Sequence, residues 1–182
     1  MRSAAKVFAS KGFSAATVRD VADEADMLSG SLYYYFDSKE AMVEAVVVEY
    51  LDRLIRDNAR AVEESEGPVE ILENLIAVGL RGLTTYRSEL TILQNDWPYV
   101  RSMPGVAERL PKVESVWLES IQRGVEEGLI RPVHDVRMIY RTLMGAVQGA
   151  VRWFDPKGKV GIDDVIAVQT TILLSGIKVD RD

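Results

Sequence analysis

Hydroxyl, phenol and ammonium groups are concentrated between residues 17 and 40 of this 182-residue chain. Such groups donate hydrogen bonds to phosphate oxygens, and small hydroxyl side chains beside a glycine can approach the edges of bases. The segment could therefore recognise a polyanion without making or breaking covalent bonds. The residues that could make these contacts are Thr17, Arg19, Ser29, Gly30, Ser31, Tyr33, Tyr34 and Lys39.

Local signals position these residues on two short helices. Thr17-Val18-Arg19-Asp20 has the pattern of a capping box, in which a hydroxyl and a carboxylate three residues apart satisfy free N–H groups at a helix start. The helix that it opens ends at a turn, Ala25-Asp26-Met27. A second helix follows with Leu32 and Phe36 toward the core, and Asp37-Ser38-Lys39-Glu40 opens the next one. Two short helices around a tight turn present a recognition helix to the major groove of DNA.

The run from Phe13 to Glu40 resembles the N-terminal signature of TetR-family repressors. Its most specific part is Gly30-Ser31-Leu32-Tyr33, followed by Phe36 and by Ser38-Lys39-Glu40. Beyond this segment the resemblance consists only of the number and order of helices. It implies a ligand-responsive repressor that binds a palindromic operator in double-stranded DNA as a homodimer, and that a small apolar or amphipathic effector releases.

The resemblance implies two kinds of DNA contact. Lys39, at a helix N-terminus, would pair with a phosphate through its charge and the helix dipole, and Thr17 and Tyr33 would donate hydroxyls to phosphates. The implied base-edge readers are Ser29, Ser31 and Tyr34, with Gly30 for close approach and Arg19 for a phosphate or a base. Structural roles stand beside these: Thr17 caps a helix in any case, Lys39 alone is an ordinary surface lysine, and Tyr35 could pack the head on the body.

Two positions depart from the family pattern. Asp26 stands where the turn usually has Gly, and Asp tolerates left-handed backbone better than most residues. Leu28 stands where the recognition helix usually has an N-cap Ser, and a leucine side chain cannot cap. Either Ser29 takes over as the cap or the helix starts one residue later, so the register of the base contacts depends on this position.

Bulk charge does not favour DNA binding. The chain carries 22 Lys and Arg against 28 Asp and Glu, for a net charge of −6. Residues 1–50 hold five cations and eight carboxylates, so this segment is also negative. DNA binding has to be argued from where the cations lie, and within residues 1–20 four of them stand against one carboxylate.

Apolar residues recur at the helical period almost throughout, and strand-like alternation is missing. We predict an all-α fold of about nine helices: an N-terminal three-helix helix-turn-helix DNA-binding head, residues 1–45, and a helical effector-binding and dimerisation body, residues 46–182. The helix over 38–64 begins in the head and ends in the body, so we expect it to link effector binding to the head. The predicted helices are 2–11, 17–24, 28–35, 38–64, 68–86, 88–101, 105–127, 134–153 and 162–178.

The body carries many large apolar and aromatic side chains with a few polar ones, which is typical of a small-molecule site and equally of ordinary core. Trp97-Pro98-Tyr99 stands out because a proline interrupts a helix beside two aromatic residues. The predicted ligand-binding residues are Leu54, Arg81, Tyr86, Gln94, Trp97, Tyr99 and Trp117. The segments 29–33 and 152–154 resemble regulators of fatty-acid and steroid breakdown, so an acyl-CoA or steroid-like ligand is our hypothesis for the effector.

The last two predicted helices have the pattern of an interface. The helix over 134–153 has one apolar stripe with small residues, and the helix over 162–178 is apolar nearly all round. A four-helix contact between two chains would cover such surfaces, while the alternative is packing on their own body only. The predicted interface residues are Ile139, Leu143, Val147, Ala150, Val165, Ile172 and Leu173.

Other classes of protein have little support. The chain has no Cys, one His, no phosphate-binding loop and no HExxH motif, so we expect no enzyme, no cofactor and no metal. We interpret His134 as a cap or surface residue. No apolar run approaches the roughly 20 residues of a membrane span, and residues 1–13 lack a signal-peptide pattern, so we expect a cytoplasmic protein. The alternative to a regulator is a helical small-molecule-binding protein with a degenerate, non-DNA-binding head.

Overall fold

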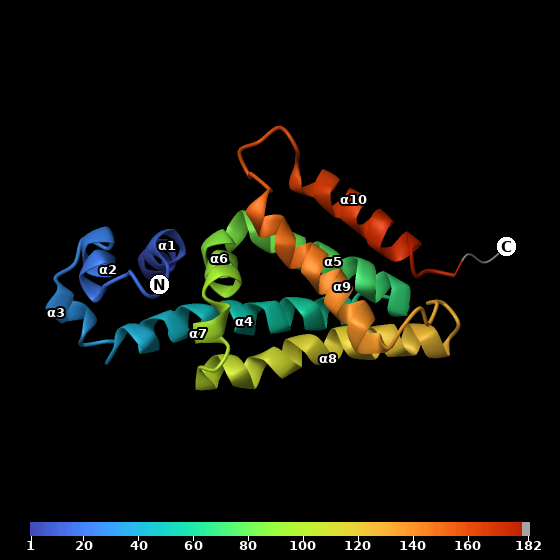
Figure 1. The fold of residues 1–182 in the computed structure, drawn as a ribbon, viewed down its shortest axis with the longest axis horizontal. Helices are drawn as coiled ribbons and strands as arrows, with labels where there is room; N and C mark the ends of the chain where they lie inside the picture. The colour runs from blue at the N-terminus through green and yellow to red at the C-terminus, as the bar shows by residue number, and fades with distance from the viewer. Residues whose placement is uncertain (180–182) are drawn as a thin grey trace. The chain divides into compact units, whose positions relative to one another are not determined.

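The computed structural model describes residues 1–179 of the chain (Figure 1). Within them lie ten α-helices, one short 3-10 helix and one isolated antiparallel bridge, between Ile130 and Lys178. The helices are α1 (Arg2–Lys11), α2 (Val18–Glu24), α3 (Ser29–Leu32), α4 (Lys39–Glu63), α5 (Pro68–Thr85), α6 (Arg87–Asn95), α7 (Trp97–Val100), α8 (Pro104–Glu126), α9 (Val136–Gly149), η1 (Ala150–Arg152) and α10 (Ile162–Ser175). The predicted all-α fold is confirmed.

Three predicted helices differ from the observed ones. The helix expected over 88–101 is two helices, α6 and α7, because Asp96 leaves the helical conformation and Pro98 then opens α7, where a missing N–H is tolerated. The recognition helix has only four residues and continues as turns to Tyr35. The helix expected over 134–153 tightens to a 3-10 turn after Gly149.

The chain divides into two compact units. Unit 1 comprises Met1–Arg53 and Tyr86–Leu110, and unit 2 comprises Leu54–Thr85 and the chain from Pro111 onward. The division therefore falls inside α4 and inside α8, where Pro111 removes one backbone N–H from the helix. Residues 86–110, which we assigned to the body, are grouped with the N-terminal helices in unit 1. The functional boundary at 45/46 remains a prediction.

Unit 1 has a continuous apolar core. The helix α1 buries Ala4, Ala5, Val7 and Phe8 and packs against α2 and α6 (Figure 1). An apolar stripe of α4 is buried in this unit at Met42, Val43, Val46, Val47, Tyr50 and Leu51. Since each buried side chain of this kind contributes about 1.5–3 kcal/mol, this core can hold the short helices of the head in place.

Two polar contacts join α4 to the start of α8 in unit 1. The backbone N–H of Gly105 donates to Oε1 of Glu44 (2.5 Å), and the Arg109 guanidinium donates to both carboxylate oxygens of Asp52 (2.6 and 3.1 Å). A Cβ on Gly105 would come within 2.9 Å of Val48, so a glycine is needed for this approach of the two helices.

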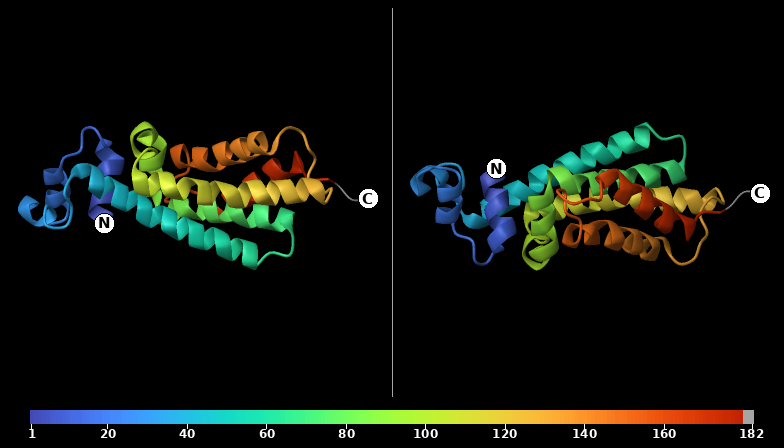
Figure 2. Two further views of the ribbon diagram at one scale, coloured as in Figure 1. Left: turned by 90° about the horizontal axis from the view of Figure 1, so that it is seen from below. Right: turned by 90° about the horizontal axis from the view of Figure 1, so that it is seen from above.

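In unit 2, α9 and α10 both pack against α5 (Figures 1 and 2). A Cβ on Gly79 of α5 would lie 2.8 Å from Cγ1 of Val147, so the glycine permits the close approach of α9. The segment after α10 is tied to the loop after α8, because Val179 N–H donates to the Leu129 carbonyl (2.9 Å) and Arg131 N–H to the Ile177 carbonyl (2.7 Å). No helix in residues 1–179 combines the length and apolar character of a membrane span.

Candidate DNA-binding interface

The first helix of the predicted helix-turn-helix is capped as its sequence indicates. The Asp20 N–H donates to Oγ1 of Thr17 (3.1 Å), and the Thr17 N–H donates to Oδ2 of Asp20 (2.9 Å), which completes the capping box. The Thr17 hydroxyl also donates to the same oxygen (2.8 Å). In this arrangement Thr17 has its hydroxyl proton engaged, and a phosphate would have to compete for it.

A lysine strengthens that cap. Nζ of Lys11 lies 2.6 Å from Oδ1 of Asp20. The hydrogen bond from Lys11, followed by those from Thr17, lowers the pKa of Asp20 from 3.8 to about 2. The carboxylate therefore stays ionised at neutral pH, near the N-terminus of α2, where the helix dipole favours a negative charge.

The turn after α2 has the geometry expected of its sequence. Asp26 takes a left-handed backbone (φ 54°), and Met27 N–H donates to the Ala22 carbonyl (2.9 Å). This is the bond that closes a Schellman motif, in which a left-handed residue ends the helix and satisfies a free carbonyl. The expectation that Asp replaces the usual Gly without loss of the turn is confirmed.

The recognition helix α3 has no side-chain cap. Leu28 occupies the N-cap position, makes no capping hydrogen bond and is 80% exposed. Neither expected alternative occurs: Ser29 does not take over the cap, and the N-cap is not shifted, because Leu28 keeps that position and the helix begins at Ser29, one residue after the predicted start at 28. Among its residues only Leu32 is buried, so one side chain anchors this helix to the core.

The predicted base readers lie on the accessible part of this segment. Ser31 and Tyr33 are exposed, Tyr34 is 86% exposed, and Ser29 is half-buried. Tyr34 forms an edge-on ring pair with the exposed Tyr35 (5.3 Å between centroids). A Cβ on Gly30 would meet nothing within 4 Å, so packing within the chain does not require a glycine there.

Lys39 has partners that the sequence did not indicate. Its Nζ donates to the carbonyls of Phe13 (2.7 Å) and Ser14 (3.3 Å) and lies 4.6 Å from the centre of the Phe13 ring. These bonds fix the loop between α1 and α2 against the start of α4, whose N-cap is Ser38. Because an ammonium group has three donors, one N–H of Lys39 remains for a phosphate.

The same loop has a second anchor that sequence reasoning missed. The backbone N–H of Phe13 donates to Oδ2 of Asp96 (3.0 Å), a carboxylate that is 7% exposed between α6 and α7. The Phe13 ring also contacts that of Tyr99 (5.6 Å between centroids). The sequence shows an aspartate just before the helix break at Pro98, but it does not indicate that Asp96 accepts a hydrogen bond from Phe13, 83 residues away.

Three cations of the head, Lys6, Lys11 and Arg19, lie beside its carboxylates. Nζ of Lys6 lies 2.5 Å from Glu24, and Arg19 lies 3.9 Å from Asp23 with its side chain exposed. Since surface ion pairs of this kind are weak, Arg19 is free to turn toward DNA at little cost. The phosphate contacts of this head would come from a few donors rather than from a broad positive surface.

The seven predicted ligand-binding residues fall in both compact units. Tyr86, Gln94, Trp97 and Tyr99 belong to unit 1, and Leu54, Arg81 and Trp117 belong to unit 2. Some have local partners: Tyr86 packs on Tyr50 (5.6 Å between ring centroids), and the exposed Arg81 lies 3.7 Å from Asp163. Trp117 is buried beside Tyr140 (6.4 Å). Their role in effector binding remains a prediction.

The predicted dimer residues are mostly inside unit 2. The five that are buried in their own unit are Ile139, Leu143, Val147, Ala150 and Val165. Leu173 is half-buried, and Ile172 is 68% exposed. The apolar stripe of α9 faces its own unit because α5 packs against it, and the surface left for another chain is a different face of these helices.

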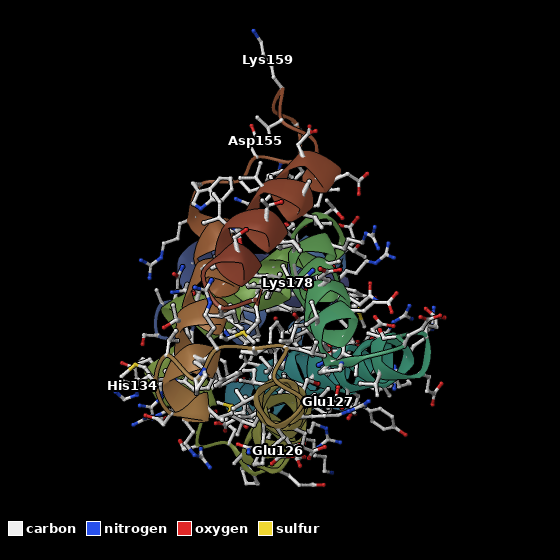
Figure 3. All side chains as sticks on the ribbon, turned by 90° about the vertical axis from the view of Figure 1, so that its right-hand side faces the viewer. Glu126, Glu127, His134, Asp155, Lys159 and Lys178 are labelled. Atoms are coloured by element: carbon white, nitrogen blue, oxygen red, sulfur yellow. The ribbon has the colours of Figure 1, made fainter. Side chains whose placement is uncertain are left out.

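His134 is a surface residue, as expected. It is exposed at the start of α9 (Figure 3), and its Nδ1 lies 2.7 Å from Asp135. Asp135 is the residue that caps the helix, since it accepts the Met138 N–H (2.9 Å). That bond, together with His134, lowers the pKa of Asp135. In residues 1–179 no three His, Cys, Asp or Glu side chains are grouped as metal ligands.

Comparison with known proteins gives the same assignment as this geometry. Residues 1–46 match the family described as bacterial regulatory proteins, tetR family, and residues 65–177 match the tetracyclin repressor-like C-terminal domain. Relatives that share this fold and sequence are transcriptional repressors, and this chain is a transcriptional regulator. This chain belongs to the TetR family.

Several relatives share most of its length. The transcriptional repressor KstR2 of Mycolicibacterium smegmatis is 34% identical over 177 residues, which are 96% of this chain and 86% of the relative. The solved structure of the ketosteroid transcriptional regulator KstR2 of Mycobacterium tuberculosis has a TM-score of 0.90 and 32% identity, over 98% of this chain and 93% of that one. The complex of AibR with isovaleryl coenzyme A and operator DNA shares the fold (TM-score 0.83, 21% identity, 93% of each chain).

Proposed function

We propose that this chain is a ligand-responsive repressor that binds a palindromic operator as a homodimer and leaves it when a small apolar or amphipathic effector binds. The observation that carries the proposal is the uncapped α3 that follows a well-capped α2: Ser31 of α3 and the tyrosines directly after it are exposed. The relatives named KstR2 are repressors, which supports the same direction of regulation.

The proposed DNA contacts divide by chemistry. Thr17, Tyr33 and Lys39 donate to phosphates and set the position of the head on the duplex. Ser29, Ser31 and Tyr34 reach the base edges, and Gly30 lets the α3 backbone come close to them. Arg19 adds a phosphate or base contact. Each of these side chains except Ser29 and Lys39 is exposed, which supports the assignment.

A second copy of the chain fits the outer face of α9 and α10. Gly145 and Gly149 would meet nothing within 4 Å if they carried a Cβ, so they do not serve packing inside the chain. Met138, Val168 and Ile172 are large apolar residues exposed on the same two helices. An isologous contact over this face would relate the two heads by a two-fold axis. A dimer of that symmetry would match the two inverted half-sites of a palindromic operator.

The effector we propose is a steroid-like ligand or an acyl-CoA. The relative KstR2 of Mycobacterium tuberculosis is a ketosteroid transcriptional regulator, and the AibR complex contains isovaleryl coenzyme A. The helix α4 extends from Lys39 in the head to Glu63 in unit 2, so a change at one end of it can reach the other. A coupling of 1–3 kcal/mol would lower operator occupancy about 5- to 150-fold.

Selection from a random double-stranded DNA library tests this proposal. The expected result is enrichment of a sequence with two inverted half-sites about one helical turn apart, or somewhat more. The selected DNA is then titrated with the protein in the presence of isovaleryl-CoA or a ketosteroid, with free coenzyme A as the control. If neither compound weakens binding of the protein to the operator, the proposed ligand response is contradicted.

A helical small-molecule-binding protein without DNA binding is the second candidate. It is favoured by the negative charge of residues 1–50, by Leu28 at the cap of α3 and by the engagement of Lys39 with two carbonyls. In that case the selection enriches no sequence, while small-molecule binding persists.

A further inference from the structure

A fully buried amide on α4 lacks a hydrogen-bond partner. Asn58 is 1% exposed, and its Nδ2 has no acceptor within residues 1–179. The position continues the buried apolar face of the helix, since Val47, Leu51 and Ala61 recur at the same helical spacing and are buried. A carboxamide therefore occupies a place where a leucine would pack.

Such a group destabilises the free protein. An amide that is removed from water without a partner loses its hydrogen bonds to solvent, and folded proteins leave few buried polar groups unpaired. The chain shows the ordinary case nearby in unit 2, where Nδ2 of Asn74 donates to Oγ of Ser65 (2.9 Å). The Nδ2 donor of Asn58 is therefore available to an acceptor from outside the chain.

The interior of unit 2, the unit that contains Asn58, also holds an aromatic pair. Trp117 is buried, and its ring lies 6.4 Å from that of Tyr140, whose pKa is raised by burial. A neutral oxygen suits this environment better than a carboxylate, which would be desolvated without a cation.

We propose that Asn58 recognises the effector by donating a hydrogen bond from its carboxamide to a ketone or thioester carbonyl of an otherwise apolar ligand. The inference rests on the effector response proposed above, and it adds the atom that selects for an oxygen acceptor. Loss of this donor leaves the ligand carbonyl unpaired in the core, so affinity falls while the fold remains.

The first test compares Asn58→Leu with Asn74→Leu by thermal unfolding without ligand. The leucine at 58 removes an unpaired amide and is expected to keep or raise the Tm. The leucine at 74 breaks a formed hydrogen bond and is expected to lower it. A Tm of Asn58→Leu as low as that of the Asn74→Leu control would show that the first amide has a structural partner, and would overturn the assignment.

The second test measures binding of androst-4-ene-3,17-dione, isovaleryl-CoA and the carbonyl-free 5α-androstane. The wild type is expected to bind at least one carbonyl compound, and Asn58→Leu to bind it at least 10-fold more weakly, which is about 1.4 kcal/mol. Asn74→Leu should match the wild type, and the hydrocarbon should not distinguish the variants. Equal affinity in Asn58→Leu, or no binding of either carbonyl compound by the wild type, overturns the proposal.

Operator release is recorded separately on the same proteins. A carbonyl compound that binds through Asn58 but leaves the operator complex intact contradicts the proposed regulatory function and not the role of Asn58. Release that persists in Asn58→Leu contradicts the role of Asn58 and not the regulatory function.

Discussion

The two short helices of the head, α2 and α3, are built in opposite ways. The helix α2 has a complete capping box at its start, a Schellman turn at its end and ion pairs along its surface. The helix α3 has four residues, no side-chain cap and one buried anchor. The difference indicates that the chain stabilises the supporting helix by itself and leaves the polar groups of the other for an external partner.

The contrast predicts that changes in α3 reduce affinity and leave stability intact. Gly30→Glu adds a carboxylate where a Cβ meets nothing within 4 Å, so the fold should not change. Facing DNA, that carboxylate opposes phosphates and base acceptors, and we expect operator affinity to fall about 100-fold. Fluorescence anisotropy gives the affinity, and thermal unfolding checks the fold.

Gly67→Glu is the matched control for this change. It adds the same charge at another glycine with open space around it, outside the helix-turn-helix. Operator affinity within about twofold of the wild type is expected there. A similar loss in both variants would mean that net charge, rather than contact at α3, sets the affinity.

Lys39 tests whether a residue that holds the loop also contacts DNA. Lys39→Gln removes one positive charge, and we expect about a 10-fold loss of operator affinity. The slope of the logarithm of the binding constant against the logarithm of the salt concentration should also become shallower by about one. The measurement is the operator Kd at several salt concentrations. An unchanged slope would assign Lys39 to the Phe13 and Ser14 carbonyls alone.

Removing the cap of α2 and adding a cap to α3 should change the stability of the protein in opposite directions. Thr17→Val removes the hydroxyl that both accepts from and donates to Asp20, and should lower the free energy of unfolding by about 1 kcal/mol. Leu28→Ser supplies the missing cap of α3 and should raise it by about 0.5 kcal/mol. Urea denaturation measures both. If Leu28→Ser has no effect while Thr17→Val destabilises, tertiary packing rather than capping limits α3.

The smallest expected effect is a pH dependence at the cap of α2. The folded-state pKa of Asp20 is lowered to about 2, so its contribution to stability is present at neutral pH and is lost as the pH falls from about 4 toward 2. Asp20→Asn removes this titration, so the stability gap between the two proteins should narrow over that range. A gap that stays constant with pH would show that the Lys11 contact does not hold the carboxylate.

Local chemistry explains what the sequence could predict. The capping box at Thr17, the left-handed Asp26 and the buried Leu32 follow from residues a few positions apart, and all three are confirmed. Lys39 is an intermediate case: its helix start was predictable, but its bonds to the Phe13 and Ser14 carbonyls bring together residues 25 or 26 apart.

Long-range packing accounts for what the sequence could not predict. The bond from Phe13 to Asp96 joins residues 83 apart, and no periodicity indicates it. The stripe that we assigned to the dimer, at Ile139, Leu143 and Val147, is apolar in either case, and only the packing of α5 decides that it faces inward. Pattern alone likewise does not distinguish ligand-binding aromatics from core, as Trp117 illustrates.

The most direct test of the DNA-binding assignment is the affinity of the purified protein for its selected operator and for a scrambled duplex, both at about 150 mM salt. We expect the operator to bind at least about 1,000-fold more tightly than the scrambled duplex, and Gly30→Glu to remove most of this preference. Equal and weak binding of the two duplexes would contradict the assignment and would leave the head without a specific DNA-binding role.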